Sequence, residues 1–455
     1  MRLGVKGLDD VIRDFPDSGL VIIAGGPGIG KSVLAGQFIY RGVVDYGERG
    51  VYVSFSETKA AFYASMASLG MDFEKLEREG LFHFLNFFIS RKEDFSLSLD
   101  SLLESISKFN ARRVVCDSIS VISPLLSEFE TRKLIQVLKA LVVNMNALCV
   151  LVCETSSEAK SDELGSLGFV SDVIILLRWR EEGAWRVKEL EVLKVRGVPV
   201  EKGIYEFDID RKHGGLWVIS PPKPALRGGR WERVATGVEW LDDALQGGLY
   251  RGSLTMVKGE SGTGKTCLCI HIAANSASRG EKCVYVSTEE SEDEVYHLLE
   301  EFGFNLESIK GGMRVIRLMP DESSPSRLYS FFDCLVDEEK PSILVIDSLT
   351  PFKYAMSHER FYKFLRYMQS LVKANRFVLV ATSTLSLIEE TVETDIIGLF
   401  DNLFILRHAL TDGAPHKTLF IVKARSSDHQ KTPLRFEVTT QGIRTVGERA
   451  PMTAT

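Results

Sequence analysis

Two glycine-rich segments of the sequence carry the residue types that bind phosphate groups. They read GGPGIGKS, from Gly25 to Ser32, and GESGTGKT, from Gly259 to Thr266. In the pattern GxxxxGK followed by Ser or Thr, the glycines let backbone N–H groups converge on phosphate oxygens at a helix N-terminus, whose dipole favours negative charge. Lys31 and Lys265 are therefore predicted to reach the β- and γ-phosphates of ATP. The glycines predicted to cradle the phosphates are Gly25, Gly28, Gly30, Gly259, Gly262 and Gly264.

A Mg²⁺ ion is expected with the ATP, and hydroxyl and carboxylate oxygens are its predicted ligands. Ser32 and Thr266 directly follow the loop lysines and supply the hydroxyls. Asp117 and Asp347 end the apolar runs VVCD and LVID, and we expect each one sheet position from a phosphate loop. An Asp at a strand end is often only a turn former, but a neighbouring phosphate loop favours a metal role.

Hydrolysis of ATP also needs a group that orients water on the γ-phosphate. Two similar stretches follow the loops, VYVSFSETK from Val51 and VYVSTEESE from Val284. The second stretch contains the adjacent acids Glu289 and Glu290, whereas the first has Ser56 and Glu57. The acids could merely begin a helix, where the dipole favours them. Their position after the strand instead favours a catalytic role.

The elements that must position these residues occur twice along the chain. Leu8-Asp9-Asp10 reappears as Leu241-Asp242-Asp243, and KVRG from Lys194 reappears as KARS from Lys423, with the loops and the strands ending in Asp between them in the same order. Such self-similarity indicates a duplicated domain. The 455 residues suit two domains of roughly 200 residues each. We predict domains over 1–221 and 231–446, a linker over 222–230 and a disordered tail over 447–455.

Within each copy, apolar strands alternate with helices, including amphipathic helices predicted over Phe129–Met145 and Arg360–Lys373. Fully apolar strands between helices indicate a mainly parallel sheet covered on both faces. After Asp172 and Asp401 the pattern is strand after strand, which predicts an antiparallel extension of the sheet. The predicted fold class is α/β, with two tandem P-loop NTPase domains.

The composition is that of an ordinary globular protein. The net charge of −7 argues against a nucleic-acid binder, which usually carries a basic surplus. No apolar run approaches the ~18–20 residues of a membrane span, and the N-terminus lacks a secretory pattern. The seven cysteines lack zinc spacing and are expected to be reduced thiols. These features together predict a cytoplasmic protein.

The duplicated loop, VYVSTEE, the strand ending in IDS and the K-x-R element closely resemble the KaiC family of RecA-like ATPases over nearly the whole chain. The resemblance implies RecA-like domains stacked into a two-tiered homo-hexameric ring, with nucleotide bound between subunits. It implies that Glu289 is the general base and Glu290 its support. It also implies that the K-x-R element reaches the neighbouring subunit's phosphates. The residues concerned are Lys194, Arg196, Lys423 and Arg425, with His429 and Lys431 at family spacing.

The first copy departs from this pattern. Ser56 stands where the first acid is expected, and Val200 stands where His429 would correspond, although Lys202 is retained. Because losing a positioned base commonly costs ~10²–10⁴ in rate, we expect domain 1 mainly to bind ATP and domain 2 to hydrolyse it. Glu57 could alternatively serve as base alone. The protein is then expected to be an ATP-driven switch in signalling or regulation, read by an unidentified partner protein.

Two alternative functions share the same core. A serine/threonine autokinase of the KaiC type needs a Ser-Thr pair, but the matching positions are Gly168 and Phe169 in one copy and Ile397 and Gly398 in the other; Thr391 and Thr394 lie near but out of register. A RecA-like ATPase of DNA recombination or repair needs basic loops. The candidate segments 154–172 and 385–401 are instead rich in acids, although the basic run in the linker could bind DNA.

Overall fold

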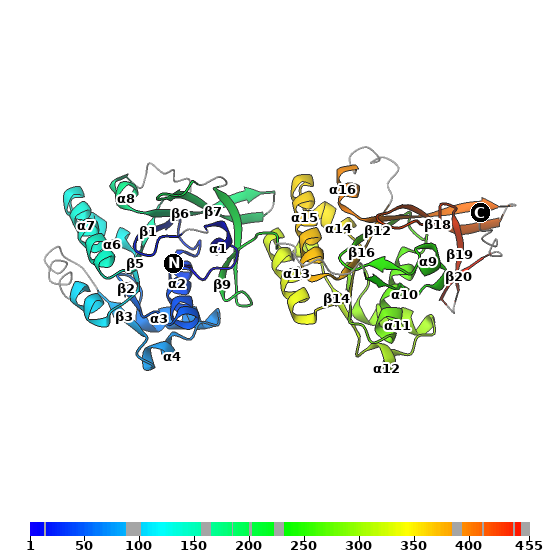
Figure 1. Cartoon of the computed structure of the whole chain (residues 1–455), viewed down its shortest axis with the longest axis horizontal. Coiled ribbons are helices and arrows are strands. Elements are labelled where there is room, and N and C mark those ends of the chain that lie inside the picture. The colour runs from blue at the N-terminus through cyan, green and yellow to red at the C-terminus, as the bar shows by residue number, and fades with distance from the viewer. Residues whose placement is uncertain are drawn as a thin grey trace. The chain divides into compact units, whose positions relative to one another are not determined.

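The computed structural model describes most of the chain: residues 1–12, 15–87, 102–155, 165–183, 185–199, 203–222, 232–384, 394–411, 414–439 and 442–446. The chain divides into two compact units, Met1–Ser220 and Pro221–Thr455. The expected linker from 223 onward and the expected tail lie outside the described residues. Each unit is built on one nine-stranded sheet, with helices on both of its faces (Figure 1).

The sheet of the first unit is parallel over six strands and antiparallel over three. Its spatial order is β3-β2-β4-β5-β1-β6-β7-β8-β9. The antiparallel part, β7 to β9, is the predicted extension, so that prediction is confirmed. The strands are β1 (Gly19–Gly25), β2 (Gly50–Ser54), β3 (Phe82–Asn86), β4 (Arg113–Asp117), β5 (Leu148–Glu154), β6 (Val173–Glu182), β7 (Trp185–Val195), β8 (Ile204–Asp210) and β9 (Gly215–Val218).

The sheet of the second unit repeats this order strand for strand, as β14-β13-β15-β16-β12-β17-β18-β19-β20. A two-stranded ribbon of β10 (Arg233–Val234) and β11 (Leu249–Tyr250) is added. The α/β class with two mainly parallel sheets is thus confirmed. The strands of this sheet are β12 (Leu254–Gly259), β13 (Cys283–Ser287), β14 (Met313–Arg317), β15 (Ile343–Asp347), β16 (Val378–Thr384), β17 (Asn402–Thr411), β18 (Ala414–Ala424), β19 (Leu434–Thr439) and β20 (Gly442–Thr445).

The helices follow the expected alternation, and the two long amphipathic ones begin at serine caps. Ser127 forms a capping box with Glu130, so the helix predicted from Phe129 begins one residue earlier; Ser357 caps the other long helix. The helices are α1 (Leu8–Val11), α2 (Lys31–Tyr46), α3 (Lys59–Ser68), α4 (Phe73–Arg78), α6 (Ile119–Ile122), α7 (Glu128–Asn144), α8 (Gly165–Val170), α9 (Glu239–Ala244), α10 (Lys265–Ser278), α11 (Glu292–Glu301), α12 (Leu306–Ile309), α13 (Pro325–Glu339), α14 (Thr350–Ala355), α15 (His358–Asn375) and α16 (Thr394–Leu399), with 3₁₀ turns at Ser123–Leu125 and Pro320–Glu322.

The central strands are apolar because both of their faces are covered. All seven residues of β1 are buried. Val21 and Ile23 belong to the core on the α2 side, whereas Leu20 and Ile22 belong to the core on the α7 side. This double burial explains why the strand reads as a continuous apolar run rather than an alternating one.

Two features of the sheet differ from the sequence-based expectation. The edge strands β3 and β14 were not predicted, because their mixed burial leaves no continuous apolar run. Asp117 is also not one sheet position from the phosphate loop, since β5 lies between β4 and β1, and β16 separates Asp347 from β12 in the same way. The expected adjacency was therefore wrong in both units.

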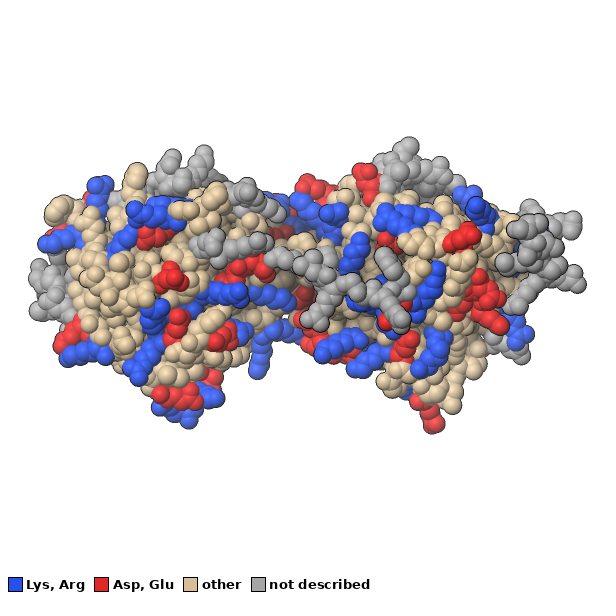
Figure 2. All heavy atoms as spheres, in the orientation of Figure 1, with Lys and Arg blue, Asp and Glu red and all other residues tan. Residues whose placement is uncertain are grey.

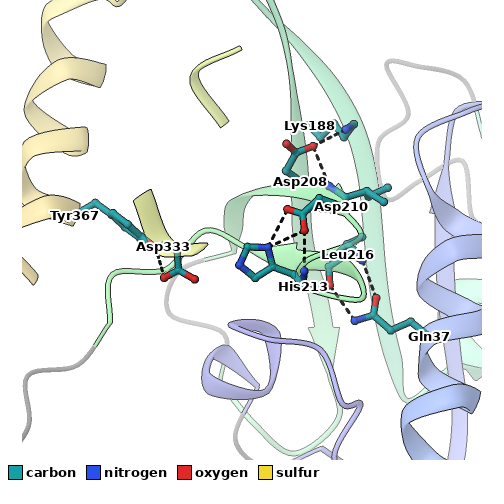
Figure 3. Close-up of polar contacts among 9 residues, drawn as sticks. Gln37, Lys188, Asp208, Asp210, His213, Leu216, Asp333 and Tyr367 are labelled. Atoms are coloured by element: carbon teal, nitrogen blue, oxygen red, sulfur yellow. Dashed lines mark hydrogen bonds and ion pairs between the residues drawn. The ribbon is translucent and has the colours of Figure 1, made fainter. Parts of the chain in front are cut away.

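Polar side-chain contacts join neighbouring elements in both units, and one of them connects the first loop helix to the antiparallel extension. The side-chain amide of Gln37 on α2 donates to the backbone O of Leu216 at 3.0 Å and accepts from its N–H at 2.8 Å (Figure 3). Lys188 on β7 pairs with Asp208 on β8 at 2.7 Å. In the second unit the hydroxyl of Tyr367 on α15 donates to Asp333 on α13 at 2.9 Å. These contacts hold elements that are distant in the sequence.

The repeated Leu-Asp-Asp motif has a structural role in both units. The carboxylate of Asp9 accepts hydrogen bonds from the N–H groups of Leu3 and Gly4, at 2.8 and 2.9 Å. Asp242 accepts from the N–H groups of Thr236 and Gly237 in the same way, at 2.7 and 2.9 Å. Each Asp thereby closes the turn that precedes a short helix. Within the described residues, no helix is long and apolar enough to cross a membrane.

Candidate nucleotide-binding sites

Each glycine-rich segment runs from the last residue of a central strand to the first turn of a helix. Gly30 and Gly264 occupy the N-cap positions of α2 and α10 with left-handed φ values of 110° and 99°. Among the described residues no side chain caps either helix start, so the first-turn N–H groups remain available to an anion. A Cβ added at Gly28 or Gly262 would meet nothing within 4 Å. Both loops therefore fit a chain of phosphates.

The antiparallel extension packs directly on each loop. A Cβ added at Gly30 would lie 2.3 Å from Ile209 Cδ1 on β8. At Gly264 the nearest atoms, at 3.4 Å, belong to Phe436 and Val438 on β19. Gly30 is thus required both for its left-handed backbone and for this close approach.

The side chains of the loop lysines bond to carbonyls of their own loops, and the charges of nearby carboxylates affect their pKa. Lys31 Nζ donates to the carbonyl of Gly26 at 2.7 Å. Burial lowers the pKa of Lys31, while the charges of Glu154 and Asp117 oppose that shift. In the second unit Lys265 Nζ donates to the carbonyls of the first two loop residues, both at 2.9 Å. Burial lowers the pKa of Lys265 too, opposed by Asp347 and Glu289.

The helix, rather than strand adjacency, brings each lysine to its Asp. Helix α2 packs across β4 and β2, and α10 packs across β15 and β13. The N-terminal residues of each helix thereby face the carboxyl ends of these strands. This arrangement replaces the expected neighbouring-strand geometry and yields the same juxtaposition of Lys31 with Asp117.

Asp117 and Asp347 are held by buried tyrosines. The hydroxyl of Tyr52 donates to Asp117 and also lies within hydrogen-bonding reach of Ser32. Tyr285 donates to Asp347 at 2.8 Å. In the second unit alone, Thr382 donates to the other oxygen of this carboxylate, because Val152 takes that place in the first unit.

A hydroxyl and a carboxylate at this place suit Mg²⁺, which binds few protein ligands and completes its shell with phosphates and water. Among the described residues, no group of three or more His, Cys, Asp or Glu side chains could hold a metal ion by itself. All seven cysteines are free thiols.

The acids after β2 and β13 occupy matched positions. Ser54 Oγ accepts from the N–H of Glu57 at 2.9 Å, and Ser287 Oγ donates to the carboxylate of Glu290 at 3.1 Å. Burial raises the pKa of both Glu57 and Glu290, and the neighbouring Asp raises it further. Glu289 is exposed beside Lys265, and the exposed Ser56 takes its position in the first unit.

The K-x-R elements lie where β7 and β18 end, beside the starts of β6 and β17, whereas the loop of each unit follows the carboxyl end of its central strand. Lys194 pairs with Ile174 at the start of β6, and its Nζ donates to the carbonyls of Gly168 and Ser171. The loop instead follows Gly25 at the carboxyl end of β1, whereas Ile174 pairs with Ile22, three residues earlier in that strand. Lys423 likewise donates to the carbonyl of Phe400, just before β17.

The arginine of each K-x-R element bonds to the Asp that directly precedes β6 or β17. Arg196 pairs with Asp172 at 3.1 Å and Arg425 with Asp401 at 3.2 Å, and both arginines are exposed. His429 is half-buried and Lys431 exposed, in the segment that follows Arg425. Residues 200 and 202, the first-unit counterparts of this segment, lie outside the described residues. Within the described residues, Lys194, Arg196, Lys423 and Arg425 thus bond to groups that precede β6 and β17 and not to the loop of their own unit.

Sequence reasoning missed one charged residue beside the first loop. Glu154 ends β5, pairs in register with Gly25, and exerts the largest charge effect on Lys31. Its counterpart in the second unit is Thr384, which pairs with Gly259. The letters alone do not show this substitution, because aligning the shared VLV of the two strands places Glu154 opposite Thr382, whereas the strand register places it opposite Thr384.

The fold and the two loops define a P-loop nucleotide-binding protein with two tandem RecA-like domains. The family model described as "ATPase: KaiC" matches residues 1–223 and 234–450. The chain therefore belongs to the KaiC family of ATPases, as the sequence resemblance indicated.

Three relatives show how distant the similarity is. The chain is 26% identical to "Circadian clock oscillator protein KaiC" of Parathermosynechococcus lividus, over 97% of this chain and 84% of that one. It is 26% identical to the protein of the same name from Synechococcus elongatus, over 97% and 88%. It is 25% identical to "Circadian clock protein KaiC3" of a Synechocystis species, over 97% and 91%.

Proposed function

We propose that the protein is a Mg²⁺-dependent ATPase in which both loops bind ATP and the second domain hydrolyses it faster, so that the chain acts as a nucleotide-driven switch. One observation carries the asymmetry. Glu289 lies beside Lys265 in the second domain, whereas Ser56 holds the matching position in the first. Loss of a positioned base typically lowers the rate by ~10²–10⁴.

The proposed roles follow the geometry of each site. Lys31 and Lys265 contact the β- and γ-phosphates, and the loop N–H groups bind the remaining oxygens. Mg²⁺ is bound by Ser32 with Asp117, and by Thr266 with Asp347. Glu289 orients the attacking water, with Glu290 in support, and Glu57 keeps the supporting position in the first site.

We propose that neighbouring subunits complete each site. The K-x-R elements lie beside the starts of β6 and β17, away from the carboxyl ends of the strands that carry their own loop, so Arg196 and Arg425 are assigned to the phosphates of another copy of the chain. A heterologous contact of this kind forms a ring when the rotation between subunits closes, and the family resemblance favours a two-tiered homo-hexamer. A regulatory protein partner that reads the state of the ring, and a cytoplasmic location, belong to the same proposal.

The autokinase and DNA-processing alternatives have less support. The register positions for a phosphate acceptor hold Phe169, which is 88% exposed, and Gly398, and neither has a hydroxyl. Thr394 begins α16, and Thr391 lies outside the described residues. On the face drawn in Figure 2, the Lys and Arg side chains of the described chain are interspersed with Asp and Glu instead of forming one basic stripe.

The proposal is tested by comparing the intact chain with Lys31→Ala and Lys265→Ala. ATP turnover and particle size by light scattering are measured in the same samples. We expect Lys265→Ala to abolish most turnover and Lys31→Ala mainly to weaken ATP-dependent assembly. Equal loss of turnover in both variants, with assembly intact, would contradict the proposed division of labour.

A further inference from the structure

The position of Glu154 is fixed by backbone contacts at the mouth of the first loop. Its Cα pairs with that of Gly25, the first loop residue, and the next N–H, of Thr155, donates to the carbonyl of Gly25 at 3.2 Å. The N–H of Glu154 donates to Ser120 Oγ at 2.7 Å. Glu154 is the one exposed residue of β5, so its side chain lies at the carboxyl edge of the sheet, beside the loop.

The second domain holds the matching backbone in the same way but with a neutral side chain. The N–H of Thr384 donates to Thr350 Oγ1 at 3.1 Å, as that of Glu154 does to Ser120. The difference at this place is therefore the side chain alone. A strand end that carries a hydroxyl in one domain carries a carboxylate in the other.

The two domains thus place the same number of carboxylates around the loop lysine, at different positions. The charges of Asp347 and Glu289 act on Lys265, whereas those of Glu154 and Asp117 act on Lys31. Glu290 and Glu57 occupy the remaining, matched position. The first domain lacks the acid that the second has at Glu289, but it has Glu154 where the second has Thr384.

We propose that Glu154 orients the attacking water in the first domain, in place of the acid absent at Ser56. The proposal rests on ATP binding at the first loop, and it assigns to Glu154 the residual turnover of that domain. The water oxygen bonds to the γ-phosphorus while the bond from that phosphorus to the β–γ bridging oxygen breaks. ADP and phosphate are released, and the water proton passes through Glu154 to solvent.

A carboxylate at this position also affects binding. It repels the γ-phosphate of ATP, while ADP has no phosphate there. Removing the charge is therefore expected to tighten ATP binding selectively. A merely structural role for Glu154 would change the affinities for ATP and ADP alike, which separates the two explanations.

Turnover is measured on the full chain with the second site silenced by Glu289→Gln and Glu290→Gln. In this background, Glu154→Gln is expected to lower the remaining turnover by about 10²-fold. Adding Ser56→Glu to that variant is expected to restore it, whereas Ser56→Gln is not. Glu128→Gln, at the exposed start of α7 where the carboxylate pairs with Arg132, is the matched control and should leave turnover unchanged.

Binding is measured by calorimetry in a Lys265→Ala chain, which leaves the first site to titrate. Glu154→Gln is expected to tighten ATP binding by about tenfold with little change for ADP. Unchanged turnover in Glu154→Gln, or equal shifts for both nucleotides, would overturn the inference. A silenced parent that binds ATP without any turnover would overturn it too, while the proposed ATP binding would stand; loss of ATP binding in the parent would instead contradict the proposed function.

Discussion

At the scale of single residues, each site keeps a partly buried carboxyl next to a second carboxylate. Glu57 and Glu290 lie behind the exposed position of the first acid, near Asp117 and Asp347. Burial and like charge both disfavour ionisation, and a pKa raised for these reasons is typical of functional sites. The raised pKa of Glu57 and Glu290 thus agrees with the supporting role proposed for them.

The substitution Glu290→Gln tests whether the ionised carboxylate of Glu290 lowers the stability of the fold. Because the pKa of Glu290 is raised in the folded state above its ordinary 4.5, ionisation destabilises the fold at neutral pH, and the effect vanishes below about pH 4.5, where both states are protonated. We expect a higher melting temperature for Glu290→Gln at pH 7, with the gain lost at pH 4.5. Turnover should fall by ~10²–10⁴.

Calorimetric melting curves across this pH range check the prediction, with Glu57→Gln as the matched variant in the first domain. A lower melting temperature for Glu290→Gln at pH 7 would show that the carboxylate stabilises the fold. The electrostatic argument would then be wrong.

At the scale of elements, each loop helix is tied to the last strand of its sheet by one side chain at a matched position. Gln37 on α2 bonds both backbone groups of Leu216 on β9. His271 on α10 bonds the N–H of Ile443 on β20 through Nε2 at 3.3 Å, and the carbonyl of Cys267 through Nδ1 at 2.7 Å. Because Nδ1 must donate and Nε2 must accept, the ring is neutral in this arrangement.

This difference predicts that mild acid weakens the contact between the loop helix and the last strand in the second domain but not in the first. Burial lowers the pKa of His271 from 6.5, so the unfolded state binds the proton more readily. The contribution of His271 is full above about pH 6.5 and is lost as the pH falls below that value. We expect His271→Gln to remove part of the acid sensitivity of the second unfolding transition, followed by heat denaturation between pH 7.5 and 5.

The first domain supplies the control for this experiment. Gln37→His should introduce acid sensitivity into the first transition, because it installs a titratable group at the matched position. If His271→Gln leaves the pH dependence of both transitions as in the parent, the Nε2 contact contributes nothing measurable.

At the scale of the whole molecule, the proposed completion of each site by a neighbouring subunit predicts that two inactive variants complement each other. We expect Lys265→Ala and Arg425→Ala each to be nearly inactive alone. A mixture should regain turnover, because a loop from the Arg425→Ala chain can face an intact arginine from the Lys265→Ala chain. With random mixing, about a quarter of the sites are intact.

Turnover is followed after the two variants are mixed, dissociated without nucleotide and reassembled with ATP. A mixture of Lys265→Ala with the double variant Lys265→Ala/Arg425→Ala is the control and should stay inactive. If the first mixture stays as inactive as this control, the arginine acts within its own chain or has no role at the site.

The sequence determined the local chemistry of this protein. A phosphate loop needs only contiguous glycines, a lysine and a hydroxyl between a strand and a helix, so Gly25–Ser32 and Gly259–Thr266 could be found from their letters. The duplication, the α/β class and the antiparallel extension followed from repeated patterns. The helix after Ser127 could be placed within a residue or two because its cap is local.

Only the tertiary structure decided what depends on strand order. β4 and β5 are both apolar because both are buried on two faces, so their letters do not show which of them lies next to β1. The separation of Asp117 from the loop strand therefore had no local signal. The sequence likewise had no local signal that places Glu154 near Lys31, or Lys194 beside the start of β6. Their positions depend on pairing between strands that are distant in the chain, and spacing along the sequence does not show which strands pair.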